Sequence, residues 1–214
     1  MEDETRATAR QYAAEALENG DDVGWFERLY ADSARGAATV PWTDDEPNPL
    51  LVGQVADGAG RRALVVGCGF GDDAAHLAEL GWAVTAFDVS PTAVETAKRR
   101  FAERDISFIT ADLLNAPQWQ FDLVVEIYTV QTLTGAARRQ AIDAIRGFVA
   151  PGGTLVVIAR AREEDEPSGA MPWPLTRAEV AALAPDECDD GAIESLYDGE
   201  EPPVRRWRAT FRRR

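Results

Sequence analysis

Between residues 61 and 160 the chain alternates short apolar segments with helical segments, and this alternation restricts the fold more than any other feature. Five segments rich in β-branched residues predict strands, and the sequences between them favour helices. Strands that are apolar throughout are typical of a parallel sheet with right-handed crossovers. The predicted strands are 62–67, 82–87, 106–110, 121–127 and 153–160, and the predicted helices are about 72–80, 91–103 and 135–149.

Local signals mark where several elements begin. Ser90-Pro91 is a favourable helix start, because serine caps free N–H groups and proline suits the first helical turn. The run Pro151-Gly152-Gly153 predicts a turn that leads into the last of these strands. Thr176, followed three residues later by Glu179, predicts a capping box for a helix that ends at about 184.

The first 50 residues predict two helices and an irregular loop. Residues 5–18 are rich in Ala, Glu and Arg, and Gly20 then marks a helix end. Asp21 or Asp22 is expected to cap a second helix, in which large apolar side chains recur at helical spacing. Three prolines within 40–49 exclude a regular element there. The recurring side chains are Trp25, Phe26, Leu29 and Tyr30.

The end of the chain predicts two further strands, around 192–198 and 204–212. In the second, Trp207, Ala209 and Phe211 alternate with arginines, which predicts one apolar and one charged face. We interpret these arginines, Arg206, Arg208 and Arg212, as a solvated strand face.

Composition narrows the function. The 214 residues suit one domain, and two cysteines with one histidine disfavour a disulfide framework, a metal site and histidine-dependent hydrolysis. A net charge of -15 disfavours nucleic acid as a partner. Apolar runs fall far short of the about 20 residues of a membrane helix. Because the sequence opens with acidic residues where a secretion signal would be basic, we expect a cytoplasmic protein.

A glycine-rich turn follows the first predicted strand and leads into a helix. It contains Gly67, Gly69 and Gly71, which let a backbone approach a ligand closely. A dinucleotide site would have another glycine at position 72, where this chain has the first of two acids, Asp72 and Asp73. Since these acids would repel a pyrophosphate, the loop favours a nucleoside ligand without a diphosphate.

Acidic residues follow the next strands at the same sheet edge, where open α/β sheets bind ligands. Asp88 ends the second strand, and its carboxylate suits the two hydroxyls of a ribose; the alternative is a turn or capping aspartate. Asp112 follows the third strand, where it can accept an amine such as that of adenine. Glu126 and Tyr128 close the fourth strand.

The glycine-rich turn and the acidic strand ends together resemble the motifs of class I S-adenosylmethionine-dependent methyltransferases over about residues 61–160. The glycine loop, Asp88 and Asp112 match the family's cofactor loop, ribose acid and adenine-side acid, and segments 121–125 and 151–155 are also characteristic. The resemblance implies a seven-stranded, mostly parallel Rossmann-like α/β sheet with helices on both faces and an antiparallel C-terminal strand pair. It implies S-adenosyl-L-methionine as cofactor, bound by Trp42, Gly67, Cys68, Gly69, Gly71, Asp88, Val89, Asp112, Leu113 and Glu126.

A narrower resemblance is to the thiopurine, thiol and halide methyltransferase branch. The segment Val40-Pro41-Trp42-Thr43-Asp44, preceded by a helix that bears Trp25, is similar to that branch's N-terminal lid. The branch usually reads Pro-Trp-Asp, so this chain has one extra residue. Trp42 would lie against the cofactor, whereas Trp25 and Phe26 are equally explained as helix packing.

Methyl transfer is an in-line displacement, and a soft acceptor such as a thiol or halide needs no general base. A phenol, amine or hydroxyl acceptor usually does. Tyr128 and Glu126 are the candidate catalytic residues, although Glu126 can equally hold the cofactor's amino-acid end. His76, inside a predicted helix, is expected to be a surface or packing residue, and Cys68 is given no nucleophilic role. The expected acceptor contacts are Trp42, Tyr128, Gln131 and the loop 160–174, where Trp173 can instead be an anchor.

We therefore expect one methyltransferase domain over 1–214 that acts on a small-molecule acceptor and binds neither nucleic acid nor membrane. Residues 1–60 form a helical lid, 61–160 the cofactor-binding core, and 161–214 the acceptor loop, a helix and the terminal hairpin. A soft nucleophile is the favoured acceptor, with O- or N-methylation as the alternative. The alternative hypotheses from other functional classes are a nicotinamide-dependent oxidoreductase and a non-catalytic S-adenosylmethionine-binding protein.

Overall fold

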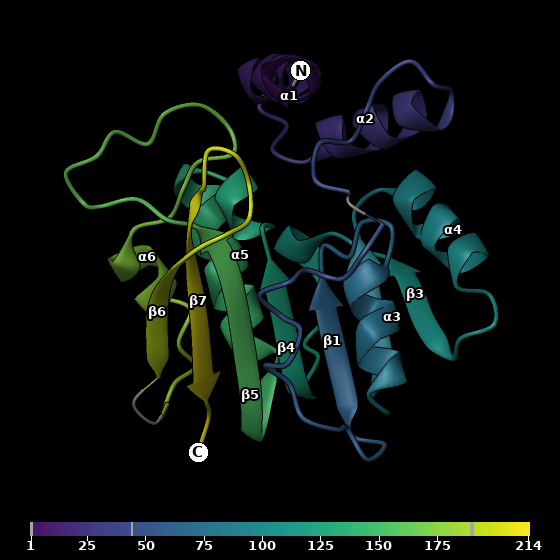
Figure 1. Cartoon of the computed structure of the whole chain (residues 1–214), viewed down its shortest axis with the longest axis vertical. Coiled ribbons are helices and arrows are strands. Elements are labelled where there is room, and N and C mark those ends of the chain that lie inside the picture. Colours follow the sequence, from purple (N-terminus) through teal and green to yellow (C-terminus); the bar gives the residue numbers. More distant parts are fainter. Residues whose placement is uncertain (1, 44, 189–190) are drawn as a thin grey trace.

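A seven-stranded mixed sheet forms the centre of the computed structural model, which describes residues 2–43, 45–188 and 191–214 (Figure 1). The strand order is β3-β2-β1-β4-β5-β7-β6. The first five strands of this order are parallel, and β7 runs antiparallel to both β5 and β6. The predicted fold class is therefore confirmed. The strands are β1 (Arg62–Val66), β2 (Ala83–Asp88), β3 (Ile106–Thr110), β4 (Phe121–Ile127), β5 (Val149–Arg160), β6 (Ala192–Tyr197) and β7 (Arg205–Arg212).

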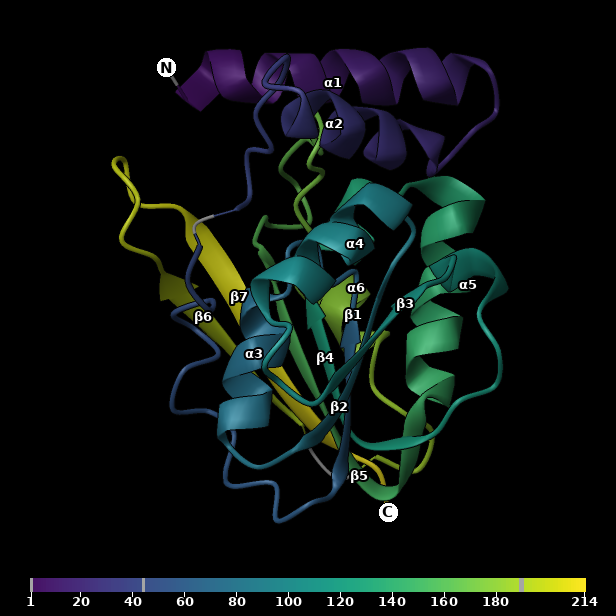
Figure 2. The ribbon, with the colours of Figure 1, turned by 90° about the vertical axis from the view of Figure 1, so that its right-hand side faces the viewer.

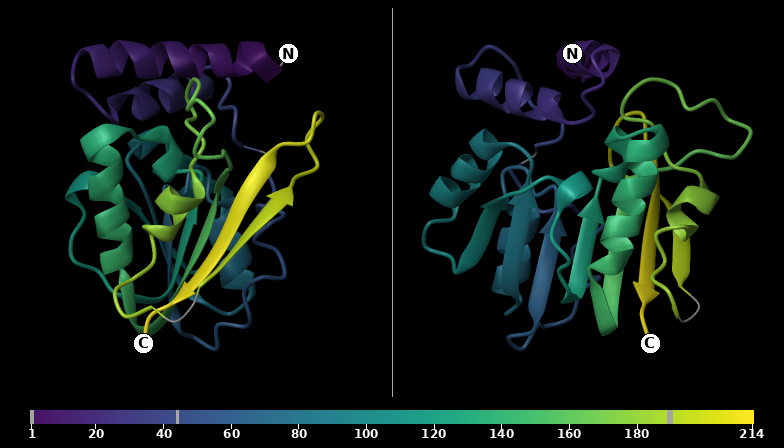
Figure 3. Two further views of the ribbon diagram at one scale, coloured as in Figure 1. Left: turned by 90° about the vertical axis from the view of Figure 1, so that its left-hand side faces the viewer. Right: turned by 180° about the vertical axis from the view of Figure 1, so that it is seen from behind.

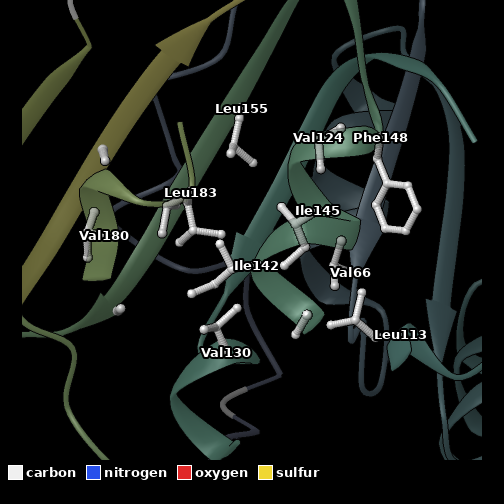
Figure 4. Packing of buried hydrophobic residues seen from close by; sticks show 14 of the residues in the cluster. Val66, Leu113, Val124, Val130, Ile142, Ile145, Phe148, Leu155, Val180 and Leu183 are labelled. Atoms are coloured by element: carbon white, nitrogen blue, oxygen red, sulfur yellow. The ribbon is translucent and has the colours of Figure 1, made fainter. Parts of the chain in front are cut away.

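Helices pack on both faces of the sheet because successive residues of the buried strands point to opposite sides. Leu64 and Val66 of β1 belong to the cluster that contains α5 (Gly135–Gly147) and α6 (Arg177–Ala181). Ala63 and Val65 belong to the cluster with α3 (Asp72–Glu79) and α4 (Pro91–Arg100) on the other face. Figure 3 shows α5 and α6 from behind, and Figure 4 shows Ile142 and Ile145 of α5 among the sheet's side chains.

The two N-terminal helices, α1 (Glu2–Glu18) and α2 (Gly24–Ala34), lie side by side across the edge where the parallel strands end (Figure 2). They form a third apolar cluster, in which Trp25, Leu29 and Tyr30 are buried. The N-cap residue of α2 is Val23 rather than the predicted Asp21 or Asp22, but Asp21 still stabilises the helix start, since its Oδ1 accepts hydrogen bonds from the backbone N–H groups of residues 23 and 24, at 3.0 and 2.7 Å.

Short helices follow β3 and β4 at this same edge. They are the 3₁₀ helices η1 (Leu113–Asn115) and η2 (Val130–Thr132). Near the other end of the chain, α6 begins with the predicted capping box, in which the Thr176 hydroxyl accepts from the Glu179 N–H and the Glu179 carboxylate accepts from the Thr176 N–H. None of the helices in the described ranges combines the length and apolar character that crossing a membrane requires.

The structure corrects several predicted boundaries. β5 begins at Val149 rather than at 153, and Pro151-Gly152-Gly153 lies inside it as an irregularity. Between two successive pairs with β4, Phe121 with Val149 and Leu123 with Thr154, β5 advances five residues while β4 advances two. The extra residues are accommodated by a local kink, so a turn-forming sequence is compatible with a continuous strand. Helices α4, α5 and α6 end two to three residues before the predicted positions 103, 149 and 184.

Glu27 connects the N-terminal helices to the core. Its Oε2 accepts hydrogen bonds from the Ser90 hydroxyl at 2.6 Å and the Thr92 N–H at 3.1 Å, and its Oε1 accepts from the Thr92 hydroxyl at 2.6 Å. These groups lie at the start of α4, where Ser90 is the predicted N-cap and accepts from the N–H of residue 93. The carboxylate thus fastens α2 to a helix N-terminus, which attracts negative charge.

We predict that Glu27→Ala loosens the two N-terminal helices while leaving the sheet intact. Hydrogen bonds to a charged group contribute about 1.5–3 kcal/mol, so amides in α1 and α2 should exchange with deuterium about tenfold faster or more. Glu95→Ala is the control, because Glu95 lies on α4 itself and forms an exposed ion pair with Lys98 of the same helix. Equal exchange rates in α1 and α2 for both variants would show that Glu27 does not hold these helices.

Candidate active site

A cavity of about 580 Å³ lies over the edge where the parallel strands end. Its lining comes from the carboxyl ends of β1 to β5, from the N-terminal helices and loop, and from the start of β7. Because β7 is antiparallel to β5, its first residues share this edge. The order reverses between β1 and β4, and such a reversal opens a crevice in α/β sheets. The volume suits a small-molecule site.

The glycine loop after β1 forms one wall of the cavity. Gly67 has φ of 60°, and a Cβ there would lie 2.3 Å from the Thr129 hydroxyl oxygen, so both backbone conformation and space demand glycine. Gly67, Cys68 and Gly69 line the cavity. Gly71 does not: it caps α3 in a left-handed conformation, and its missing Cβ leaves room for the Phe108 ring. Its requirement for glycine is therefore explained by packing.

The two acids after the loop have separate partners. Arg100 donates to both carboxylate oxygens of Asp72, each at 2.8 Å, which offsets the charge that we expected to repel a pyrophosphate. Asp73 accepts the N–H of Asn48 at 2.8 Å and thereby connects the loop 40–49 to α3. Burial raises the pKa of Asp73 to about 6.

Asp88 lies at the end of β2 and lines the cavity beside the glycine loop. Its Oδ2 accepts the Gly69 N–H at 2.9 Å and its Oδ1 accepts the Ser90 N–H at 2.9 Å. The predicted alternative, a turn-holding aspartate, is thus part of its role. Burial raises the pKa of Asp88 to about 6, although both hydrogen bonds favour the ionised form.

Three more predicted cofactor residues, Val89, Asp112 and Leu113, line the same side of the cavity. Asp112 is also the N-cap of η1: its Oδ1 accepts the Leu114 N–H at 2.9 Å, and its Oδ2 accepts from the Asn115 amide at 2.7 Å. Each carboxylate oxygen can accept a further hydrogen bond, so these contacts leave acceptor capacity toward the cavity.

Tyr128 lines the cavity from a strained backbone position, with φ of 61° directly after β4. Glu126 holds the turn that follows, since its Oε1 accepts the Thr129 and Val130 N–H groups at 2.8 and 2.9 Å. Glu126 itself is fully buried and does not line the cavity. In this structure Glu126 therefore holds the turn behind the cavity wall, and its role as a base or cofactor contact stays a prediction.

The loop and helices above the cavity contribute an aromatic wall. Trp42 lines the cavity, its ring centroid lies 6.2 Å from that of Phe26, and its indole N–H donates to the Tyr30 hydroxyl at 3.0 Å. Of the two aromatic residues expected either at the site or in packing, Phe26 lines the cavity and Trp25 is buried in the helix cluster. Asp44, part of the predicted lid motif, lies outside the described residues.

The acceptor residues predicted after β4 divide into two groups. Gln131 and Met171 line the cavity, and the Gln131 amide oxygen also accepts the Arg160 N–H at 2.7 Å, which ties η2 to the end of β5. Trp173 does not line it: its backbone N–H donates to the Gln131 carbonyl, and its side chain packs against the N-terminal apolar cluster, so it anchors the loop there rather than on the sheet. Burial raises the pKa of the Cys68 thiol well above its usual range, consistent with a thiol that is not nucleophilic.

Arg206 is a site residue that sequence reasoning missed. It is 4% exposed, lines the cavity, and lies with its guanidinium carbon 4.9 Å from the centre of the Tyr128 ring. Its Nη2 is 2.6 Å from Asp198 Oδ2, and Glu200 is a second partner. The interpretation of a solvated arginine face is wrong at this position. The signal would have been the antiparallel pairing of β7 with β5, which brings the start of β7 to the active edge.

Sequence and structure comparisons both find proteins that are named as methyltransferases. A sequence profile of the methyltransferase domain matches residues 63–153. "Probable thiol methyltransferase 2" of Arabidopsis thaliana is 28% identical over 180 residues, 78% of each chain. The 2-heptyl-1-hydroxyquinolin-4(1H)-one methyltransferase of Mycobacteroides abscessus is 26% identical over 174 residues, 78% of this chain and 76% of that protein. The N-methyltransferase NodS of Bradyrhizobium japonicum, solved with S-adenosyl-l-homocysteine, has a TM-score of 0.66 and 24% identity over 87% of this chain and 98% of that one.

Burial raises the pKa of Glu126 to about 7, and within the described residues its Oε2 has no hydrogen-bond partner. Above pH 7 the folded chain must carry this buried charge, whereas at pH 5 the carboxyl is protonated. A raised carboxyl pKa therefore costs stability as the pH rises through the interval between the unfolded and folded values. Glutamine can keep the acceptor oxygen for Thr129 and Val130 without the charge.

We predict that Glu126→Gln melts at a higher temperature than the natural protein at pH 8 and at nearly the same temperature at pH 5. A change of 1 kcal/mol moves the midpoint by about 2–4 °C in a chain of this size, so calorimetry resolves the effect. Glu103→Gln, at an exposed position, is the control and should show no such pH dependence. A destabilisation by Glu126→Gln that is larger at pH 8 than at pH 5 would contradict the assignment of a buried, costly charge.

Proposed function

We propose that this chain, which belongs to the class I S-adenosylmethionine-dependent methyltransferases, methylates a small molecule through a soft nucleophilic atom, a thiol or a halide. The family makes S-adenosylmethionine the cofactor, and when bound it supplies an electrophilic methyl group on a sulfonium sulfur. The residues of the chain then have to bind and align the acceptor, since positioning alone can lower the barrier by about 7–11 kcal/mol.

The cofactor side of the cavity has a donor and acceptor set that fits this molecule. The Asp88 carboxylate, with an N–H of the glycine loop already fixed on it, is positioned to accept the hydroxyls of a ribose. Asp112 can accept an exocyclic amine, and Leu113 and Val89 provide apolar walls for a base. We also propose that Trp42 covers this side from above, as part of a lid formed by residues 1–60, over a core formed by 61–160.

The acceptor side offers poor general bases, and this observation carries the choice of a soft nucleophile. Burial raises the pKa of Tyr128, which makes its hydroxyl harder to ionise. The backbone N–H groups and Arg206 around Asp198 lower the pKa of that carboxyl, so it is a weak base. Glu126 has no access to the cavity. A thiolate or halide needs no proton removed at the site, and one relative is named as a probable thiol methyltransferase.

O- or N-methylation is the second candidate. Burial raises the pKa of Glu200, which lines the cavity and is therefore a carboxylate suited to take a proton from an acceptor there. A structural relative is an N-methyltransferase. This function is the second candidate because Glu200 forms ion pairs with Arg160 and Arg206, which make its carboxylate less available as a base.

We predict that Asp88→Ala weakens binding of S-adenosylhomocysteine by about tenfold or more, because hydrogen bonds to a charged group contribute about 1.5–3 kcal/mol. Asp88→Asn is the fold-preserving comparison, since an amide oxygen can still accept from the loop. Asp105→Ala, at an exposed position before β3, is the control. Titration calorimetry measures all three, and unchanged affinity in Asp88→Ala would remove the ribose assignment.

Turnover tests the acceptor class. We predict that release of S-adenosylhomocysteine from S-adenosylmethionine occurs with iodide, bisulfide or an aryl thiol, and is slower by at least tenfold with a catechol or an amine. The predicted pH profile with an aryl thiol follows ionisation of that thiol, since no enzyme base is needed. Turnover with the catechol or the amine alone would overturn the soft-nucleophile proposal and favour the second candidate.

A further inference from the structure

Two arginines stand directly opposite each other on neighbouring strands at the acceptor end of the cavity. Arg160 ends β5, Arg206 lies near the start of β7, and the two are paired in the antiparallel register. Both line the cavity, and their side chains are 15% and 5% exposed. Like charges directly opposite across a sheet are destabilising. Two residues further along β7, Arg208 instead faces Glu194 of β6 and forms an ion pair of 2.9 Å with it.

The carboxylate of Glu200 lies between these arginines. Glu200 belongs to the connection between β6 and β7, and its carboxylate forms ion pairs with Arg206 through Oε1 and with Arg160 through Oε2, the latter at 3.5 Å. Its Oε2 is also 3.6 Å from Arg6 of α1. An anion is thus bound where two strands and the N-terminal helix meet. Its source is a side chain on an exposed loop, 30% exposed itself.

Arg206 does not depend on Glu200 for its charge balance, because Asp198 is 2.6 Å from it. Within the described residues the Arg160 guanidinium, by contrast, forms one ion pair, the longer contact with Glu200. Burial lowers the pKa of Arg160, and the nearby Arg6 and Arg206 lower it further, which reflects the cost of gathering these cations away from water. An anion at this point would offset that cost, and a planar carboxylate matches the guanidinium geometry.

We propose that the methyl acceptor carries a carboxylate that binds between Arg160 and Arg206 and displaces Glu200. The inference rests on the proposed methyl transfer to a small molecule and specifies its substrate class. The Tyr128 ring, against which Arg206 lies, and Trp42 line the same cavity as flat apolar surfaces, so the acceptor has an aromatic body. Its nucleophilic atom lies at the end remote from the carboxylate. Glu200 is then an internal competitor for the anion site.

The test compares two acceptors that differ in the anion, 4-mercaptobenzoate and 4-methylbenzenethiol. Arg160→Gln should raise KM for 4-mercaptobenzoate about tenfold or more, and should change KM for 4-methylbenzenethiol less than about twofold. Arg160→Lys, which keeps the charge, should recover part of the loss. Glu200→Gln should lower KM for 4-mercaptobenzoate several-fold without reducing kcat, because the competing carboxylate is removed.

Arg205→Gln is the matched control. Arg205 neighbours Arg206 but points away from the cavity, where it pairs with Glu163 at 2.6 Å, so neither acceptor should be affected. Two results would overturn the proposal: an equal loss with both acceptors in Arg160→Gln, or a loss of kcat with both in Glu200→Gln. The latter would make Glu200 the general base of the second candidate function.

A binding experiment separates failure of this inference from failure of the proposed function. Benzoate and benzamide are titrated into the protein saturated with S-adenosylhomocysteine. Binding of benzoate at least about tenfold tighter than benzamide, lost in Arg160→Gln and enhanced in Glu200→Gln, supports the carboxylate site even if neither thiol is methylated. Equal binding of the two, while S-adenosylhomocysteine binds normally, refutes the carboxylate site and leaves the methyltransferase function standing.

Discussion

The reversal of strand order between β1 and β4 is the constraint on which the rest of this structure depends. Neighbouring parallel strands need crossovers, and the crossovers from β1 and from β4 leave in opposite directions. The loops that follow these two strands therefore separate and leave a crevice between them. Gly67 and Tyr128 line that crevice from its two sides, and both have a left-handed backbone that ordinary strand or helix geometry does not supply.

The proposed acceptor and cofactor sides of the cavity differ in their electrostatics because different strands supply their charged residues. Acids from the ends of β2 and β3 line one side, and arginines from β5 and β7 line the other. The chain as a whole carries a net charge of -15, so the arginine pair is a local exception. Burial keeps this exception effective, since charges inside a cavity are screened less than charges at the surface. Selectivity for an anion is therefore compatible with an acidic exterior.

Local sequence signals predicted the features of the structure that depend on residues close together in the chain. The parallel strands, the Ser90 and Thr176 caps and the glycine loop each depend on residues within a few positions of one another, and all are found in the structure. The position of Asp88 could be predicted because all strands of a parallel sheet end at the same edge, so a residue at a strand end must lie there. The seven-stranded sheet with its antiparallel terminal pair followed from the resemblance to a family, which summarises contacts that periodicity alone does not contain, whereas the strand order came from the structure.

Long-range partners could not be predicted in the same way. Arg206 looks like one member of an exposed arginine series until β7 is paired with β5, and Asp72 looks like an uncompensated acid until α4 brings Arg100 to it. Glu126 follows the pattern of a strand-end acid but points to the turn behind the cavity wall. For Arg206 and Asp72, the contact that determines the role of the side chain comes from a residue distant in sequence. For Glu126 it comes from the turn outside the cavity.

The most direct test of this account is a crystal structure of the protein with S-adenosylhomocysteine and 4-mercaptobenzoate. The account predicts the ribose against Asp88, the adenine beside Asp112, and the carboxylate of the acceptor between Arg160 and Arg206 with Glu200 displaced. Cofactor density away from the glycine loop would contradict the assignment of this cavity as the methyl-transfer site. An acceptor whose carboxylate points away from the arginines, with Glu200 still in place, would contradict the anion site.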